Sequence, residues 1–146
     1  MPNQFNTNLG YFQANLDSEF SHTISTTDEW EKISPDWTDQ EIYQYNAELD
    51  RGTMRFLVKG TWRVDFVGTW QGATNDNVQL TIKGANQGTF YPPVKWNARG
   101  GNNWCISYAM LFKTSRPDNI EIYLKNEDDT AESTLTKAIL TGIKLY

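Results

Sequence analysis

The side chains that could carry out acid–base or nucleophilic chemistry are few and far apart in this 146-residue sequence. His22 is the only histidine and Cys105 the only cysteine, and neither lies in a recognisable motif with a partner. Catalysis needs a nucleophile, a base or a metal set that the fold brings together. We therefore expect His22 to be a solvated residue, Cys105 to be an ordinary buried thiol, and the protein not to be an enzyme.

Acidic residues gather in two short stretches, at 36–41 and at 127–129. Carboxylate oxygens can bind Ca²⁺, but calcium loops space their ligands as Asp-x-Asp-x-Asp-Gly, and neither stretch has that spacing. Both are expected to be solvated turns. The sequence therefore predicts no metal site and no cofactor.

Tryptophan is the residue type that most suggests binding. Trp62 and Trp104 are in phase with alternating apolar neighbours, which indicates burial. Trp96 lies in a Pro- and Gly-rich stretch beside Arg99. Exposed aromatic rings stack on sugars, and Trp, Tyr and Arg are enriched at protein interfaces. Trp96 and Arg99 are therefore candidates for a ligand site or an interface, with local packing of Trp96 as the third alternative.

Alternating apolar and polar residues predict the strands that would position these groups. The stretch from Tyr45 to Trp70 predicts two strands joined near Gly60, a residue that tolerates a positive φ. Apolar residues recur with a period of two on both sides of this glycine, at Met54, Phe56, Val58, Trp62, Val64 and Phe66. This period is typical of a sheet with one face in a core.

Similar patterns predict further strands at 22–33, 78–82, 104–112, 120–124 and 135–146. The strand at 78–82 is expected to have one wet face. In the strand at 104–112, Ala109 and Leu111 add apolar residues to the second face, so this half is expected to be covered on both sides. The last strand is expected to have one apolar face, made of Leu135, Ile139, Ile143 and Leu145. Short strands separated by turns, without a convincing helix, indicate an antiparallel sandwich.

Residues 1–22 follow no sustained period, yet they contain six large apolar side chains: Phe5, Leu9, Tyr11, Phe12, Leu16 and Phe20. Left uncovered, side chains of this kind lower solubility. We interpret residues 1–22 as an extended arm that docks on a partner, with a floppy terminus as the alternative. Residues 23–146 are then the folded domain.

The order of landmarks resembles that of the C1q/TNF-type jelly roll. The central motif of that family is similar to Tyr45-Asn46, Gly52, Phe56 and Gly60, the last followed by Trp62 and Phe66. Its final motif is similar to Gly142 to Tyr146, and Asp118 stands in the usual Gly-Asp turn with Pro117 in place of the glycine. The resemblance implies an all-β, antiparallel jelly-roll sandwich that forms a homotrimer, here preceded by the extended arm.

Composition disfavours several classes of partner. The net charge of −5 disfavours nonspecific binding to nucleic acid, which needs clustered cations. No apolar run approaches the roughly 20 residues that span a bilayer, so we expect no membrane insertion. The first residues lack the basic and apolar regions of a secretory signal, and no Asn-x-Ser/Thr sequon occurs. Folding in the cytoplasm is expected.

These observations favour a non-enzymatic structural protein of a virion, by analogy that of a bacteriophage, made in the host cytoplasm. It would be a head or tail fibre, a decoration protein or a receptor-binding knob. Its expected partners are further copies of itself, other virion proteins bound through the arm, and a host surface glycan or protein. A soluble carbohydrate-binding jelly-roll module, with Trp96 and Arg99 in its site, is the alternative. A secreted signalling ligand is disfavoured because the signal and sequons are missing.

Overall fold

The computed structural model describes residues 9–39, 44–50, 53–86, 91–101, 103–115 and 117–146. Within these residues nearly all regular structure is β-strand, apart from a 3-10 helical turn at Arg99–Gly101. The strands are β1 (Tyr11–Leu16), β2 (Phe20–Thr23), β3 (Glu31–Ile33), β4 (Trp37–Asp39), β5 (Ala47–Asp50), β6 (Thr53–Phe56), β7 (Gly60–Gly72), β8 (Asn77–Gly84), β9 (Val94–Asn97), β10 (Trp104–Thr114), β11 (Asp118–Asn126) and β12 (Glu132–Lys144).

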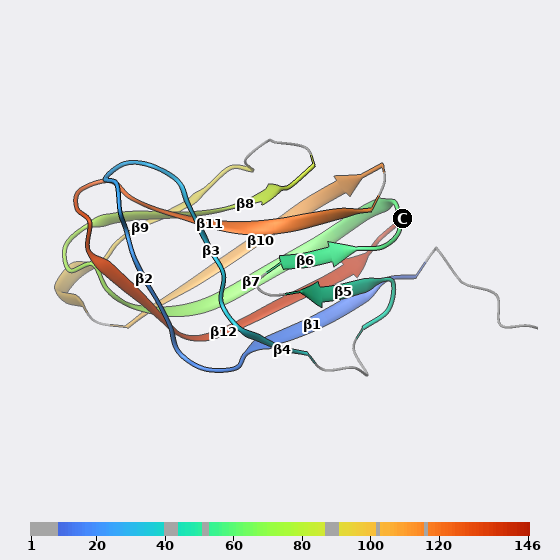
Figure 1. Cartoon of the computed structure of the whole chain (residues 1–146), viewed down its shortest axis with the longest axis horizontal. Helices are drawn as coiled ribbons and strands as arrows, with labels where there is room; N and C mark the ends of the chain where they lie inside the picture. Colours follow the sequence, from blue (N-terminus) through green and yellow to red (C-terminus); the bar gives the residue numbers. More distant parts are fainter. Residues whose placement is uncertain (1–8, 40–43, 51–52, 87–90, 102, 116) are drawn as a thin grey trace, which may run out of the picture.

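The strands form two antiparallel sheets of six strands each, packed face to face (Figure 1). The first sheet has the order β10-β7-β12-β1-β4, with β2 also paired to β12. The second sheet has the order β5-β6-β11-β8-β9, with β3 also paired to β11. Many neighbours in these sheets are distant in sequence, as in β1 beside β12. The antiparallel sandwich predicted from the sequence is confirmed.

The core consists of the side chains that alternation predicted on the central strands. Trp62, Val64 and Phe66 of β7 have no exposed surface. The ring of Phe56, from β6 of the second sheet, stacks on Trp62 with 4.5 Å between ring centroids. Phe112 of β10 lies 5.1 Å from the same Phe56 ring. Aromatic side chains from both sheets therefore interdigitate at the centre of the sandwich.

One strand is more deeply buried than its pattern suggests. The polar residues Gln79 and Thr81 of β8 were expected on a wet face, but they are 3% and 0% exposed. The Gln79 amide donates a hydrogen bond to the Glu127 carboxylate, and the Thr81 hydroxyl donates to the main-chain oxygen of Tyr91. Because these polar groups have partners, their burial is tolerated.

The boundary expected between residues 22 and 23 is wrong for the part of the chain that the structure describes. β1 pairs with β12 on one side and with β4 on the other, so it lies inside the first sheet. Phe12 is buried, and its ring centroid lies 6.0 Å from that of Phe56. Leu16 and Phe20 also pack against the core, whereas Leu9 and Tyr11 are exposed. Phe5 lies outside the described residues.

Two glycines allow β1 to dock this closely. A Cβ on Gly142, the residue paired with Phe12, would lie 2.1 Å from the Phe12 ring. A Cβ on Gly10 would lie 2.3 Å from the Trp62 indole. Real Cβ atoms do not approach other atoms so closely. Each ring therefore lies over a stretch of backbone that only glycine leaves open.

Two local irregularities also depart from the sequence expectation. The strand expected over 22–33 is divided into β2 and β3. In β12 the register shifts between Leu135 and Lys137, which indicates a β-bulge. The extra residue reverses the alternation, so Leu135 points into the core while Ile139 and Ile143 point outward and are exposed. The single apolar face expected for this strand is therefore wrong.

We predict that Phe12→Ala destabilises the protein by about 3–5 kcal/mol, the range for removing a buried aromatic side chain. The reason is that Phe12 fills the space between Gly142 and Phe56. Gln13→Ala, on the opposite side of the same strand, should cost far less. Chemical denaturation measures both. Equal and small effects would show that β1 is not part of the cooperative fold.

Candidate assembly face

The outward side of the first sheet carries two apolar rows that cross neighbouring strands. In the first row, Tyr11 of β1 pairs with Ile143 of β12, and Arg63 of β7 links Ile143 to Leu111 of β10. In the second row, four residues along the strands, Ile139 of β12 pairs with Val67 of β7. We call these apolar residues the assembly face: Tyr11, Val67, Leu111, Ile139 and Ile143.

The apolar side chains of the assembly face are well exposed in the single chain. Their exposed fractions are 39% for Tyr11, 42% for Val67, 46% for Ile139, 51% for Ile143 and 57% for Leu111. Single exposed apolar residues are normal, but Tyr11 and Ile143 adjoin one another on paired strands, and so do Val67 and Ile139. Exposed apolar residues that gather on one side of a folded protein indicate an interaction site.

The row between the two apolar rows is mainly polar, and its one charge is neutralised by a residue of the first row. Gln13, Thr141, Asp65 and Ala109 occupy it in the order of the strands. The Arg63 guanidinium donates two hydrogen bonds to the Asp65 carboxylate, with N···O distances of 3.1 and 3.3 Å. Because the two charges pair with each other, the assembly face presents no net charge that would repel a second copy.

The outward side of the second sheet is different in kind. Lys32 and Glu121 form an ion pair at 2.7 Å, and Arg55 and Glu48 form another at 3.5 Å. The Lys83 ammonium lies 5.6 Å from the centroid of the Tyr123 ring. Such paired charges are compatible with water. The contrast shows that the apolar exposure of the first sheet is specific to one side of the sandwich.

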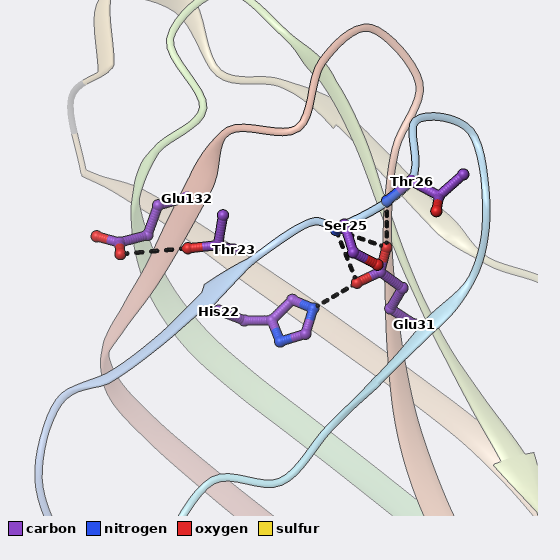
Figure 2. Close-up of polar contacts among 6 residues, drawn as sticks. All are labelled: His22, Thr23, Ser25, Thr26, Glu31 and Glu132. Carbon is purple, nitrogen blue, oxygen red and sulfur yellow. Dashed lines mark hydrogen bonds and ion pairs between the residues drawn. The ribbon is translucent and has the colours of Figure 1, made fainter.

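His22 is hydrogen-bonded rather than freely solvated, which corrects the sequence expectation (Figure 2). Its Nε2 lies 3.0 Å from Oε1 of Glu31. The same carboxylate accepts hydrogen bonds from the backbone N–H groups of Ser25 and Thr26. Glu31 therefore holds the turn that follows β2. Burial raises the pKa of Glu31, but these hydrogen bonds outweigh it, so the pKa is lowered below its ordinary value of 4.5.

Cys105 is exposed, so the expectation of a buried thiol is wrong. Successive residues of a strand point to opposite sides of the sheet. Its apolar neighbours Trp104 and Ile106 therefore face the core and direct Cys105 outward. Among the described residues, no group of three or more His, Cys, Asp or Glu side chains is placed to hold a metal ion. Asp128 instead accepts hydrogen bonds from the backbone and side chain of Asn77.

Trp96 and Arg99 lie on successive elements, β9 and the 3-10 turn that follows it. Trp96 lies on β9, is only partly exposed and packs against the core. Its ring centroid is 6.2 Å from that of Trp70, which agrees with the alternative of local packing. Arg99 is exposed in the 3-10 turn. A ligand role for the pair stays a prediction.

Solved structures of similar fold are found although no family model and no curated protein sequence matches the chain. Murine APRIL at pH 5.0 has a TM-score of 0.66 and 9% identity, with 94% of this chain and 99% of that chain covered. An Eiger TNF from S. frugiperda has a TM-score of 0.68 and 10% identity, with 94% of each chain covered. The fold is therefore a TNF-like jelly roll, as the sequence predicted, and identities this low show the fold alone.

Sequence reasoning missed the assembly face although its signal is present in the chain. Ala109 and Leu111 on the second face of β10 were interpreted as a strand covered on both sides, yet both are exposed in the single chain. None of the described residues of this chain covers them. None of the described helical segments is long and apolar enough to cross a membrane.

We predict that Glu31→Gln lowers stability at neutral pH, and that the difference from wild type vanishes well below pH 4.5. A carboxyl group whose pKa is lowered by folding stabilises the protein above its unfolded pKa, and the contribution disappears as pH falls through the lowered value. Thermal unfolding across this pH range measures the effect. Glu132→Gln is the control, because Glu132 makes a single 3.5 Å contact with Thr23. A difference that is constant with pH would exclude an ionised Glu31 as the cause.

Proposed function

We propose that this chain is a non-enzymatic structural protein that assembles as a homotrimer on a virus particle. The observation that carries the proposal is the pair of apolar rows on the outward side of the first sheet. The trimer and the virion are separate parts of the proposal, and each has its own support and test.

The trimer is supported by the geometry of the assembly face and of the strand beside it. β10 is the edge of the first sheet, with 11 residues, and no described strand pairs with its outer side; such edge strands invite pairing or covering. Leu111 lies on this edge strand, so the assembly face extends to the edge of the sheet. Association of identical subunits would remove both from water. At about 25 cal/mol per Å² of apolar surface, such burial can offset the cost of association.

The proposed virion role is supported by the chemical character of the histidine and the cysteine side chains. The only histidine is hydrogen-bonded to Glu31, and the chain's one thiol has no partner for an intrachain disulfide. A lone exposed thiol fits folding in a reducing cytoplasm. In this proposal a bacteriophage is the source, the host cytoplasm is the place of synthesis, and the jelly roll projects as a fibre head, decoration or receptor-binding knob. A host glycan or protein is a further partner.

Anchoring to other virion proteins is proposed for the residues ahead of β1. Removing residues 1–22, as an arm of that length suggests, would also remove β1 and the buried Phe12. A shorter truncation that ends at residue 8 leaves every described strand in place. The truncated chain then begins with the exposed Leu9, directly before Gly10 and the sandwich.

The assembly face gives the first test. Wild type should have about three times the chain mass by light scattering at micromolar concentration, and Val67→Glu with Ile139→Glu should give a folded monomer. The two introduced carboxylates lie opposite each other on paired strands and would be buried unpaired in an interface. Leu57→Glu is the matched control, because Leu57 is an exposed apolar residue outside this face. A monomeric wild type, or an unchanged trimer in the double variant, would contradict the role of the face.

The virion gives the second test. The full-length chain should sediment with purified particles produced from the genome that encodes it, whereas the chain lacking residues 1–8 should remain a trimer and stay in the supernatant. Circular dichroism of the truncated chain is the control for folding. Absence of the full-length chain from purified particles would refute the virion role. Normal incorporation of the truncated chain would show that the jelly roll itself attaches the protein to the particle.

A further inference from the structure

A cleft of about 890 Å³ opens at the end of the sandwich where the C-terminal strand finishes. Three segments that are far apart in sequence form it: residues 58–61 before and at the start of β7, residues 111 and 113–115 at and just after the end of β10, and residues 144 and 146 at and just after the end of β12. These strand ends gather near the C-terminus in Figure 1. The volume falls within the range of small-molecule sites.

The cleft is cationic although the chain as a whole has a net charge of −5. Lys59, Lys113 and Lys144 line it, and none of the described lining side chains is acidic. Elsewhere in the described chain, five Lys or Arg side chains have a carboxylate within 4 Å. Lys59 and Lys144 have no such partner there. Ammonium groups that gather in this way favour the entry of an anion into the cleft.

The shape of the backbone directs Lys144 into this position. Gly60 has a φ of 150°, and a Cβ on it would lie 2.5 Å from Cε of Lys144 and 2.7 Å from the main-chain oxygen of Tyr146. The glycine therefore leaves the space through which the Lys144 side chain runs. The Thr61 N–H donates to the Tyr146 oxygen at 2.6 Å, which fixes the end of the chain beside the cleft.

The remaining lining is largely apolar. Val58 is buried beneath the cleft, while Leu111 and Tyr146 are more than half exposed beside it. Thr114 and Ser115 add hydroxyl groups at the end of β10. Ligand sites usually combine an apolar lining with a few polar groups that fix orientation. Here the polar groups are ammonium groups, which select a negatively charged head.

We propose that this cleft binds an amphipathic anion, with a carboxylate or sulfate head at Lys59 and Lys144 and an apolar chain on Val58 and Tyr146. The inference is independent of the virion role and uses a different part of the molecule from the centre of the assembly face. Leu111 borders both surfaces, and the proposed site does not depend on it.

Isothermal titration calorimetry on the full chain, with decanoate as the probe, tests the proposal. Decanoate should bind, and Lys59→Gln with Lys144→Gln should weaken it by about tenfold or more, because hydrogen bonds to charged groups are lost. Lys95→Gln is the matched control, an exposed lysine on β9 of the other sheet, and should bind decanoate as wild type does. Light scattering of the double variant should give the wild-type mass, which separates this test from that of the assembly face.

Two further ligands test the contributions of the charged head and the apolar tail separately. Decanol, which has the tail without the charge, and inorganic sulfate, which has a charge without the tail, should each bind far more weakly than decanoate. Equal binding of decanol would refute the role of the lysines, and equal binding of sulfate would refute the apolar part of the site. The proposal is also overturned if wild type fails to bind decanoate at millimolar concentration, or if the double variant binds it as wild type does.

Discussion

The packing of flat aromatic rings against glycine backbone is the constraint on which the rest of this sandwich depends. Trp62 lies over Gly10, and Phe12 lies over Gly142, so each ring occupies space that any side chain would fill. Phe56 then stacks on Trp62 and approaches Phe12, which joins the second sheet to the first. These contacts hold β1 between β12 and β4. They also align β1 with β12, which brings Tyr11 and Ile143 together on the outward side.

Period-two alternation predicted the inward residues of the central strands because each of those strands keeps an unbroken register. The prediction from alternation failed where a local feature changes which side of the sheet the residues face. The bulge after Leu135 reverses the outward and inward sides of β12, and no residue type in this stretch indicates a bulge. β1 was hidden for another reason: its inward residues include the small Ala14, while the large Tyr11 faces outward. Cys105 was misplaced because its apolar neighbours suggested burial, whereas neighbours in a strand face the opposite side.

The candidate site was less predictable than the fold, since single-chain sequence patterns do not distinguish a core face from an interface. Apolar residues on both faces of β10 are compatible with burial inside one chain or between two chains, and only the register of the strands shows that Leu111 remains exposed. The cleft was beyond sequence reasoning for a related cause. Its lysines come from three strand ends, and their proximity is a property of topology alone. Conversely, Trp96 stood out by residue type, yet the Trp70 ring beside it explains much of its environment.

Symmetry limits how the assembly face can be used. A face that packs on its own copy about a twofold axis makes a closed dimer, whereas a ring of three requires the face to contact a different surface of the neighbour. The surface adjoining the face is the β10 edge, which pairs with no described strand on its outer side and carries the exposed Leu111. If the edge of each subunit rests on the face of the next, every copy gives one edge and receives one, and three such contacts close the ring. The neutral Arg63–Asp65 pair fits this arrangement, because a charged centre would repel the edge that must approach it.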